Sequence, residues 1–218
     1  MEDPRAAEGV RFAALAASEP SLAVRRWKVL SGRKAVGCSP RFPVPEILHC
    51  VGLLPVLARD GEEILRLEPL VDAWAFEAGQ DGGVAATGEE KPVFLLEDPI
   101  PATLADALDR VEALAEWAEK LSGEPCSEGA LEKSLRAYEE RDVLIRRLAE
   151  RCGTSPGFLD PGVHRALVSS ACFLPAETHA ILLGRVLGAD VPEGPTGEEA
   201  GDPFLRLAHR WNERRRNP

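Results

Sequence analysis

Apolar residues along this chain follow two patterns, and the change from one to the other divides the sequence. In the first half, short apolar runs are bounded by Gly, Pro or charged residues, which is typical of buried strands. The cores of these runs, which we expect to be neighbouring parallel strands, are residues 35–37, 55–57 and 93–96. The segment between the first two begins at Pro45, carries Glu46 in its first turn and ends at Gly52, which are ordinary helix boundaries. Strand, helix and strand in succession predict the start of a parallel sheet.

In the second half, apolar residues recur at helical spacing, and each repeat begins at a helix-starting residue. Thr103, with Asp106 three residues later, resembles a capping box. Ser127 is an N-cap candidate for a second helix, Asp160 precedes a proline at a first helical position, and Pro175 begins another helix. We therefore expect a series of helices after residue 103.

Taken together, these patterns predict an α/β fold. We expect a short parallel, Rossmann-like sheet with flanking helices, followed by a helical C-terminal half. The predicted division is an N-terminal helical segment at 1–30, one α/β domain at 31–189, and a linker with a basic C-terminal helix at 190–218.

Composition narrows the function classes. The 218 residues include 26 Lys and Arg against 36 Asp and Glu, a formal net charge of -10, so broad binding to a nucleic-acid backbone is not expected. No apolar run approaches the ~20 residues that span a bilayer, so no membrane partner is expected. The first ten residues are acidic and lack the pattern of a secretory signal.

The cysteines are scattered, and their spacing suggests neither a disulfide framework nor a metal site of the Cys-x-x-Cys kind. They are Cys38, Cys50, Cys126, Cys152 and Cys172. We expect Cys38 and Cys50 to be packing residues that approach each other, and the remaining three to lie on the far, helical side of the domain. Free cysteines suit a reducing cytoplasm, which is the predicted location.

One stretch is specific. Residues 37–56 contain Glu46, His49, Gly52 and Pro55 in the order of a known motif. This stretch resembles the N-terminal signature of the 2-hydroxyacyl-CoA dehydratase and benzoyl-CoA reductase family, to which the D-component of 2-hydroxyglutaryl-CoA dehydratase belongs. The likeness covers residues 25–190, the N-terminal domain only.

The resemblance implies a lyase-type activity. Family members form heterodimers that remove water from a 2-hydroxyacyl-CoA, or reduce an aromatic thioester, after an ATP-driven activator delivers one electron. By this resemblance Glu46, Ser39 and His49 are the candidate catalytic residues, with Ser39 and Glu46 nearest the acyl thioester. Two alternatives stay open: Glu46 as an ordinary first-turn carboxylate that interacts with the helix dipole, and His49 as a structural histidine.

The family cofactor is a [4Fe-4S] cluster, held by cysteines from both halves of the subunit. The segment that corresponds to its first ligand, 58–90, contains no cysteine. We therefore expect no cofactor in the isolated chain. Activity would then need a partner chain, either a larger dehydratase-family subunit or a second copy, with an acyl-CoA as possible ligand. The alternatives are a non-catalytic, cluster-free relative that binds a partner or a CoA ligand, and a truncated gene product without a separate function.

Overall fold

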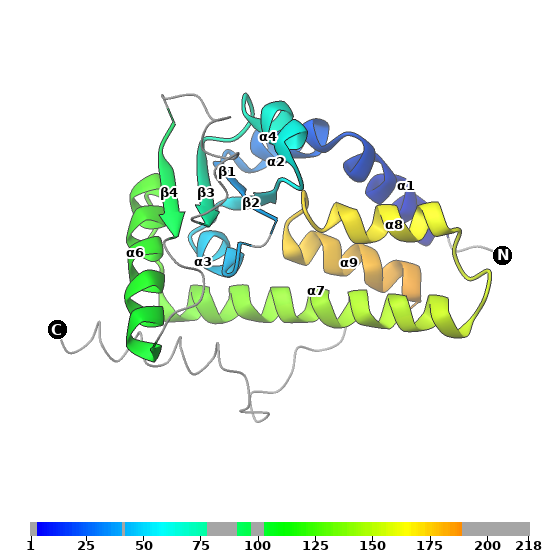
Figure 1. Cartoon of the computed structure of the whole chain (residues 1–218). Helices are drawn as coiled ribbons and strands as arrows, with labels where there is room; N and C mark the ends of the chain where they lie inside the picture. Colours follow the sequence, from blue (N-terminus) through cyan, green and yellow to red (C-terminus); the bar gives the residue numbers. More distant parts are fainter. Residues whose placement is uncertain (1–3, 41, 78–90, 97–102, 189–218) are drawn as a thin grey trace. The chain divides into compact units, whose positions relative to one another are not determined.

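The computed structural model describes residues 4–40, 42–77, 91–96 and 103–188 (Figure 1). These residues divide into two compact units, which we describe separately. One contains the sheet, within residues 25–135, and the other contains residues 4–24 and 136–188. The sequence-based division at residues 30 and 189 stays a prediction, and the predicted linker and basic C-terminal helix lie outside the described residues.

The sheet unit is built on four parallel strands in the order β2-β1-β3-β4. The strands are β1 (Ala35–Cys38), β2 (Leu54–Leu57), β3 (Ala73–Glu77) and β4 (Val93–Leu96). In the register, Val36 faces Pro55 of β2, and Gly37 faces Trp74 of β3. The predicted α/β class, with a parallel sheet and a helical C-terminal half, is confirmed.

The predicted strand neighbours are partly wrong. β1 and β2 pair as expected, but β4 pairs with β3 and not with either of them. The strand β3 was not among the strands predicted from the sequence. Its residues Ala73 to Phe76 are all buried, so both faces of β3 are covered and it shows no alternation of apolar with polar residues.

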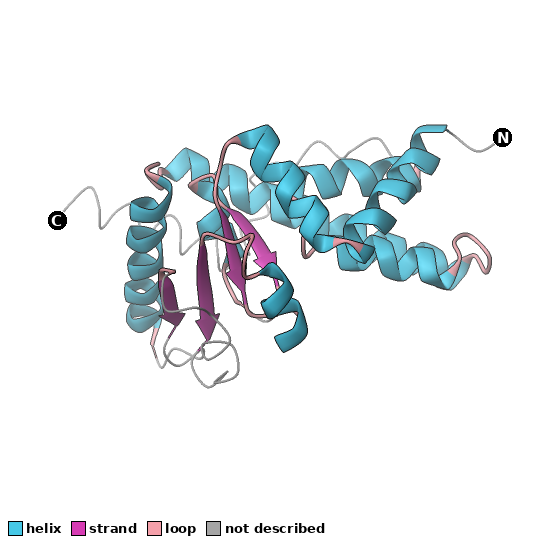
Figure 2. Ribbon diagram, turned by 90° about the horizontal axis from the view of Figure 1, so that it is seen from above, coloured by secondary structure: helices cyan, strands magenta, loops and turns pink. Residues whose placement is uncertain are grey.

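Helices flank the sheet (Figure 2). The helix α3 (Pro45–Cys50) connects β1 to β2, and α4 (Gly61–Leu67) leads back toward β3 on the other side of β1. Because parallel crossovers are right-handed, two connections that run in opposite directions place their helices on opposite faces of the sheet. The connections on the two sides of β1 therefore run in opposite directions, which puts a topological switch point between β1 and β3.

One face of the sheet packs against α3, α6 (Leu104–Ser122) and the first turns of α7 (Glu128–Thr154). Thr103 and Asp106 form a complete capping box at the start of α6, as predicted, and Gly123 ends the helix with a φ of 82°. The core on this side includes residues from the strands, α3, α6 and α7, namely Val36, Cys38, Leu48, Ala75, Leu114, Cys126 and Leu131.

The other unit is helical. It contains α1 (Pro4–Ser18), the later part of α7, α8 (Pro161–Ser170) and α9 (Ala176–Leu187), with α1 packed on α8 and α9. The N-terminal part of the chain forms two helices, α1 and α2 (Pro20–Ser31), and Asp160 caps α8 as predicted. Among the helices of the described residues, none is long and apolar enough to cross a membrane.

Candidate functional site

The carboxyl end of β1 lies at the topological switch point of the sheet, where the connections from neighbouring strands run in opposite directions. β1 continues through α3 to β2 on one side, while β3 lies on its other side. In open parallel sheets, the loops diverge at such a switch point and leave a crevice where ligands bind. Ser39, the first residue after β1, therefore occupies the position where this fold most often places a ligand-binding residue.

Ser39 is held tightly. Its side chain is 1% exposed, and its backbone N–H donates to the carbonyl of Ala75 in β3 at 3.2 Å. Its hydroxyl has no hydrogen-bond partner among the described residues. Buried polar atoms normally have one, so this hydroxyl is an unsatisfied buried polar group at the end of β1.

A close approach between β1 and β3 lies just before Ser39. A Cβ on Gly37 would lie 2.3 Å from ring carbons of Trp74, so only glycine fits there. Trp74 is fully buried and stacks on Phe76, with ring centroids 5.3 Å apart. The glycine that ends the apolar run thus lets a large aromatic ring cover the strand.

The motif residues of α3 are connected by a serine that sequence reasoning missed. Ser134 of α7 donates its hydroxyl proton to the backbone carbonyl of Glu46 at 2.8 Å, and its oxygen also lies 2.8 Å from Nδ1 of His49. A hydroxyl has one proton to donate, and Ser134 donates it to the backbone carbonyl of Glu46. Nδ1 of His49 must therefore be the donor in the second hydrogen bond. His49 is therefore protonated on Nδ1.

Ser134 is 1% exposed, and it lies on the same helix stripe as Leu131 and Tyr138. In the sequence, the only indication of a special role for Ser134 is that a polar residue stands among apolar residues at helical spacing. The contact places Glu46 and His49 on a helix fastened to α7. Both side chains are half-buried.

The cysteines are arranged differently from the prediction. Cys50, the last residue of α3, has its Sγ 2.8 Å from Sγ of Cys126, in the connection between α6 and α7. The expectation that Cys126 lies on a far side was thus wrong, because the α6–α7 connection returns to the end of α3. Cys38 is fully buried with its thiol directed to the carbonyl of Val36, and burial raises the pKa of that thiol.

These thiols do not fit the cluster that the family resemblance implies. A [4Fe-4S] cluster needs about four soft ligands around it. In the described ranges, no three His, Cys, Asp or Glu side chains come together in a way that could hold a metal ion. Cys152 and Cys172 belong to the helical unit. The prediction that the isolated chain binds no cluster stays a prediction.

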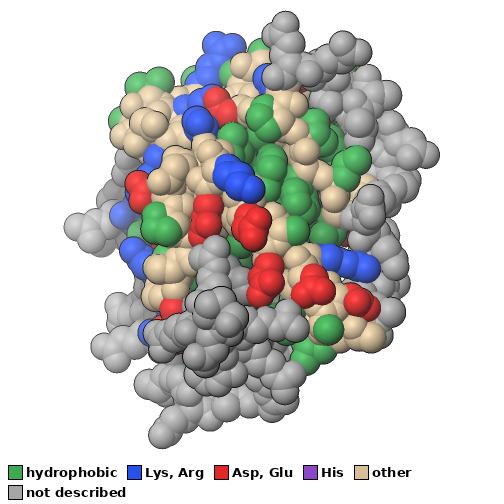
Figure 3. Space-filling model, turned by 90° about the vertical axis from the view of Figure 1, so that its left-hand side faces the viewer, with side chains coloured by type: hydrophobic (Ala, Val, Ile, Leu, Met, Phe, Trp, Pro, Cys, Tyr) green, Lys and Arg blue, Asp and Glu red, His purple; other side chains and the backbone are tan. Residues whose placement is uncertain are grey.

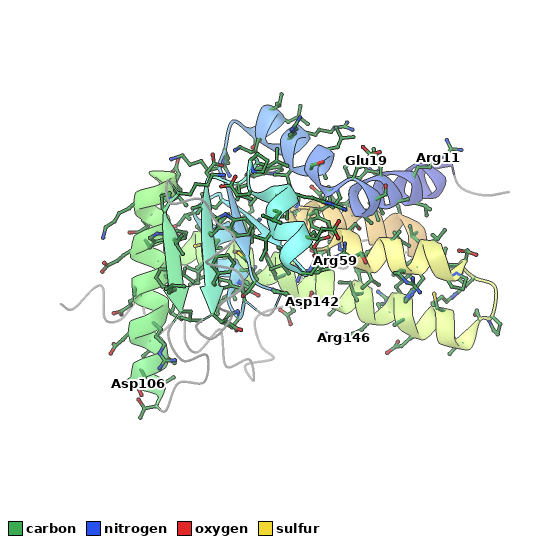
Figure 4. All side chains as sticks on the ribbon, turned by 45° about the horizontal axis from the view of Figure 1, so that its top comes forward. Arg11, Glu19, Arg59, Asp106, Asp142 and Arg146 are labelled. Carbon is green, nitrogen blue, oxygen red and sulfur yellow. The ribbon has the colours of Figure 1, made fainter. Side chains whose placement is uncertain are left out.

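A groove lies at the edge of the sheet, between β4 and the first half of α6. It has a volume of about 470 Å³ and is lined by Phe94, Leu95, Leu96, Asp106, Asp109, Arg110 and Ala113. Figure 3 shows apolar side chains on this side of the molecule with acidic side chains beside them, and Figure 4 shows Asp106 at the N-terminal end of α6. Sequence reasoning did not find this groove, since its two walls are separated in the chain.

Two comparisons of the sequence with known proteins were made, one with family models and one with curated proteins. No family model matches the sequence, and no curated protein matches it either. The resemblance of residues 37–56 to the dehydratase family therefore rests on the motif residues themselves.

Proposed function

We propose that this chain is part of a dehydratase-type enzyme. It contributes one wall of a site for a 2-hydroxyacyl-CoA, or for an aromatic acyl-CoA, and it needs a partner chain for activity. The observation that carries the proposal is the strand order, which puts the motif residues after β1 at the switch point of the sheet. The partner is a larger dehydratase-family subunit or a second copy, and the location is the cytoplasm.

The chemistry of the motif residues supports a thioester site. Ser39 offers a buried hydroxyl with no partner among the described residues, which suits a hydrogen bond to a ligand oxygen. Glu46 lies in the first turn of α3, after the same strand. A serine and a carboxylate can position a hydroxyacyl group, but no step of the reaction is assigned to a metal cluster in this chain.

Binding is the direct test. Titration of the 218-residue chain with a 2-hydroxyacyl-CoA in a calorimeter should give saturable heat, and free CoA should bind more weakly because the acyl group is missing. Glu46→Gln should weaken binding, while the matched control Glu62→Gln on α4, whose side chain is 73% exposed, should bind like wild type. If neither thioester nor CoA gives saturable heat, the proposal fails.

A second function is favoured by one observation, the contact of Ser134 with His49 and Glu46. This contact gives His49 a structural role, which suits a non-catalytic, cluster-free relative that binds a partner or a CoA ligand. Mixing the chain with a larger dehydratase subunit, its activator, ATP and a reductant separates the two functions. Turnover that requires this chain supports the first, and binding without turnover supports the second.

A further inference from the structure

The two thiols of Cys50 and Cys126 are positioned for bond formation. Their sulfurs lie 2.8 Å apart, and a disulfide bond is about 2.05 Å long, so the sulfurs need to move less than an ångström. The two residues are 76 positions apart in the chain. The fold, not the local sequence, has therefore brought them together.

Both cysteines are held in place. Cys126 donates its backbone N–H to a carboxylate oxygen of Glu119 on α6 at 2.7 Å. Cys50 ends α3, and its thiol also contacts the carbonyl of Ile47 at 3.1 Å. Cys126 is 2% exposed, whereas Cys50 is half-buried. An oxidant therefore reaches Cys50 first.

We propose that Cys50 and Cys126 form a reversible disulfide, with a small-molecule disulfide such as oxidised glutathione as the oxidant. The Cys50 thiolate attacks one sulfur of oxidised glutathione, forms a mixed disulfide and releases one glutathione thiolate. The Cys126 thiolate then attacks Sγ of Cys50 and releases the second. The two protons from the protein thiols go to the two glutathione thiolates, so the protein loses two hydrogen atoms and two molecules of reduced glutathione form.

The surroundings set the rate of this reaction. The hydrogen bond that the Cys50 thiol makes with the sulfur of Cys126 favours its protonated form and, together with burial, raises the pKa of Cys50. Because the thiolate is the attacking species, oxidation is slow at neutral pH and speeds up as the pH rises. The disulfide would join the end of α3, one residue after His49, to the α6–α7 connection and fix the motif helix. This inference is independent of the proposed function.

The experiment uses the native 218-residue chain incubated with oxidised glutathione, followed by thiol counting and by mass spectrometry of peptides digested without reduction. Two of the five free thiols should be lost, the linked peptides should contain Cys50 and Cys126, and reduction should restore both thiols. Cys50→Ser and Cys126→Ser should each abolish the link. The matched control Cys152→Ser should retain it.

A second control does not depend on the folding of a variant. The wild-type chain is oxidised in urea, where the unfolded chain should form several different cysteine pairs in place of the single pair expected in the folded chain. Three results on the native wild-type chain would overturn the proposal: a stable glutathione adduct on Cys50 without the link, links between other cysteines in similar amounts, or full retention of five thiols at alkaline pH.

Discussion

Gly37→Ala tests the contact that closes β1 against β3. The new methyl group would lie 2.3 Å from two ring carbons of Trp74, whereas carbon atoms in ordinary contact are about 3.5 Å apart. Trp74 cannot move aside easily, because it is fully buried and stacked on Phe76. The substitution therefore forces a rigid ring or a strand to shift.

The expected cost follows from two opposing effects. Overpacking of a dense core costs about 1–3 kcal/mol, and the size of this overlap favours the upper end. Alanine in place of glycine within a strand returns about 0.5–1 kcal/mol. The net loss in the free energy of unfolding should therefore be about 2 kcal/mol, which lowers the Tm by roughly 4–8 °C in a chain of this length.

Urea unfolding followed by circular dichroism measures this loss. Gly61→Ala is the matched control, since a Cβ at Gly61 meets no atom within 4 Å, and it should be neutral or slightly stabilising. In a Trp74→Leu background, Gly37→Ala should lose most of its cost, because the ring that it strikes is gone. Unchanged stability of Gly37→Ala, or an equal loss in both backgrounds, would refute the argument.

Three further predictions concern stability. Burial lowers the pKa of His179 from 6.5 to about 4. Between pH 4 and 6.5 the unfolded chain therefore binds a proton that the folded chain does not. The free energy of unfolding should fall by up to about 3 kcal/mol as the pH is lowered from 6.5 to 4. Urea titrations at several pH values should show a smaller dependence of this free energy on pH for His179→Gln. Asp72→Asn should cost about 1 kcal/mol in thermal unfolding, because it weakens the 2.8 Å ion pair with Lys28, which is part-buried. Oxidation of Cys50 and Cys126 should raise the stability to urea by up to about 4 kcal/mol, and a reductant should remove the gain.

The helices that the sequence predicted best are those with local boundary signals. Thr103 and Asp106 satisfy each other's backbone within one turn, and Asp160 accepts from the N–H of Gly162 two residues later. Both devices work without help from distant residues. For this reason they are readable in the sequence and unchanged in the structure.

The strand β3 could not be read in the same way. Its sequence, Ala-Trp-Ala-Phe-Glu, alternates small with large apolar residues, and the reason becomes visible only from its neighbours. Trp74 needs the space above Gly37, and Ala75 pairs between Cys38 and Phe94. The requirement for small residues is thus set by pairing between segments that are far apart in the chain.

The same reasoning explains what the sequence could say about the candidate site. The positions of Ser39 and Glu46, after a strand and at a helix start, follow from local pattern, so the motif could be placed at the carboxyl end of β1. The partner of His49 could not, because Ser134 lies 85 residues away and meets it only through the packing of α7 on α3. The Ser134 hydroxyl donates its hydrogen bond to the backbone carbonyl of Glu46, so it can only accept from Nδ1 of His49. The tautomer of His49 therefore depends on a residue outside the motif. Ser134→Ala would remove the hydroxyl that accepts from Nδ1 of His49. The change in acyl-CoA affinity of this variant would measure how much the site depends on the contact between α7 and α3, beyond the motif residues themselves.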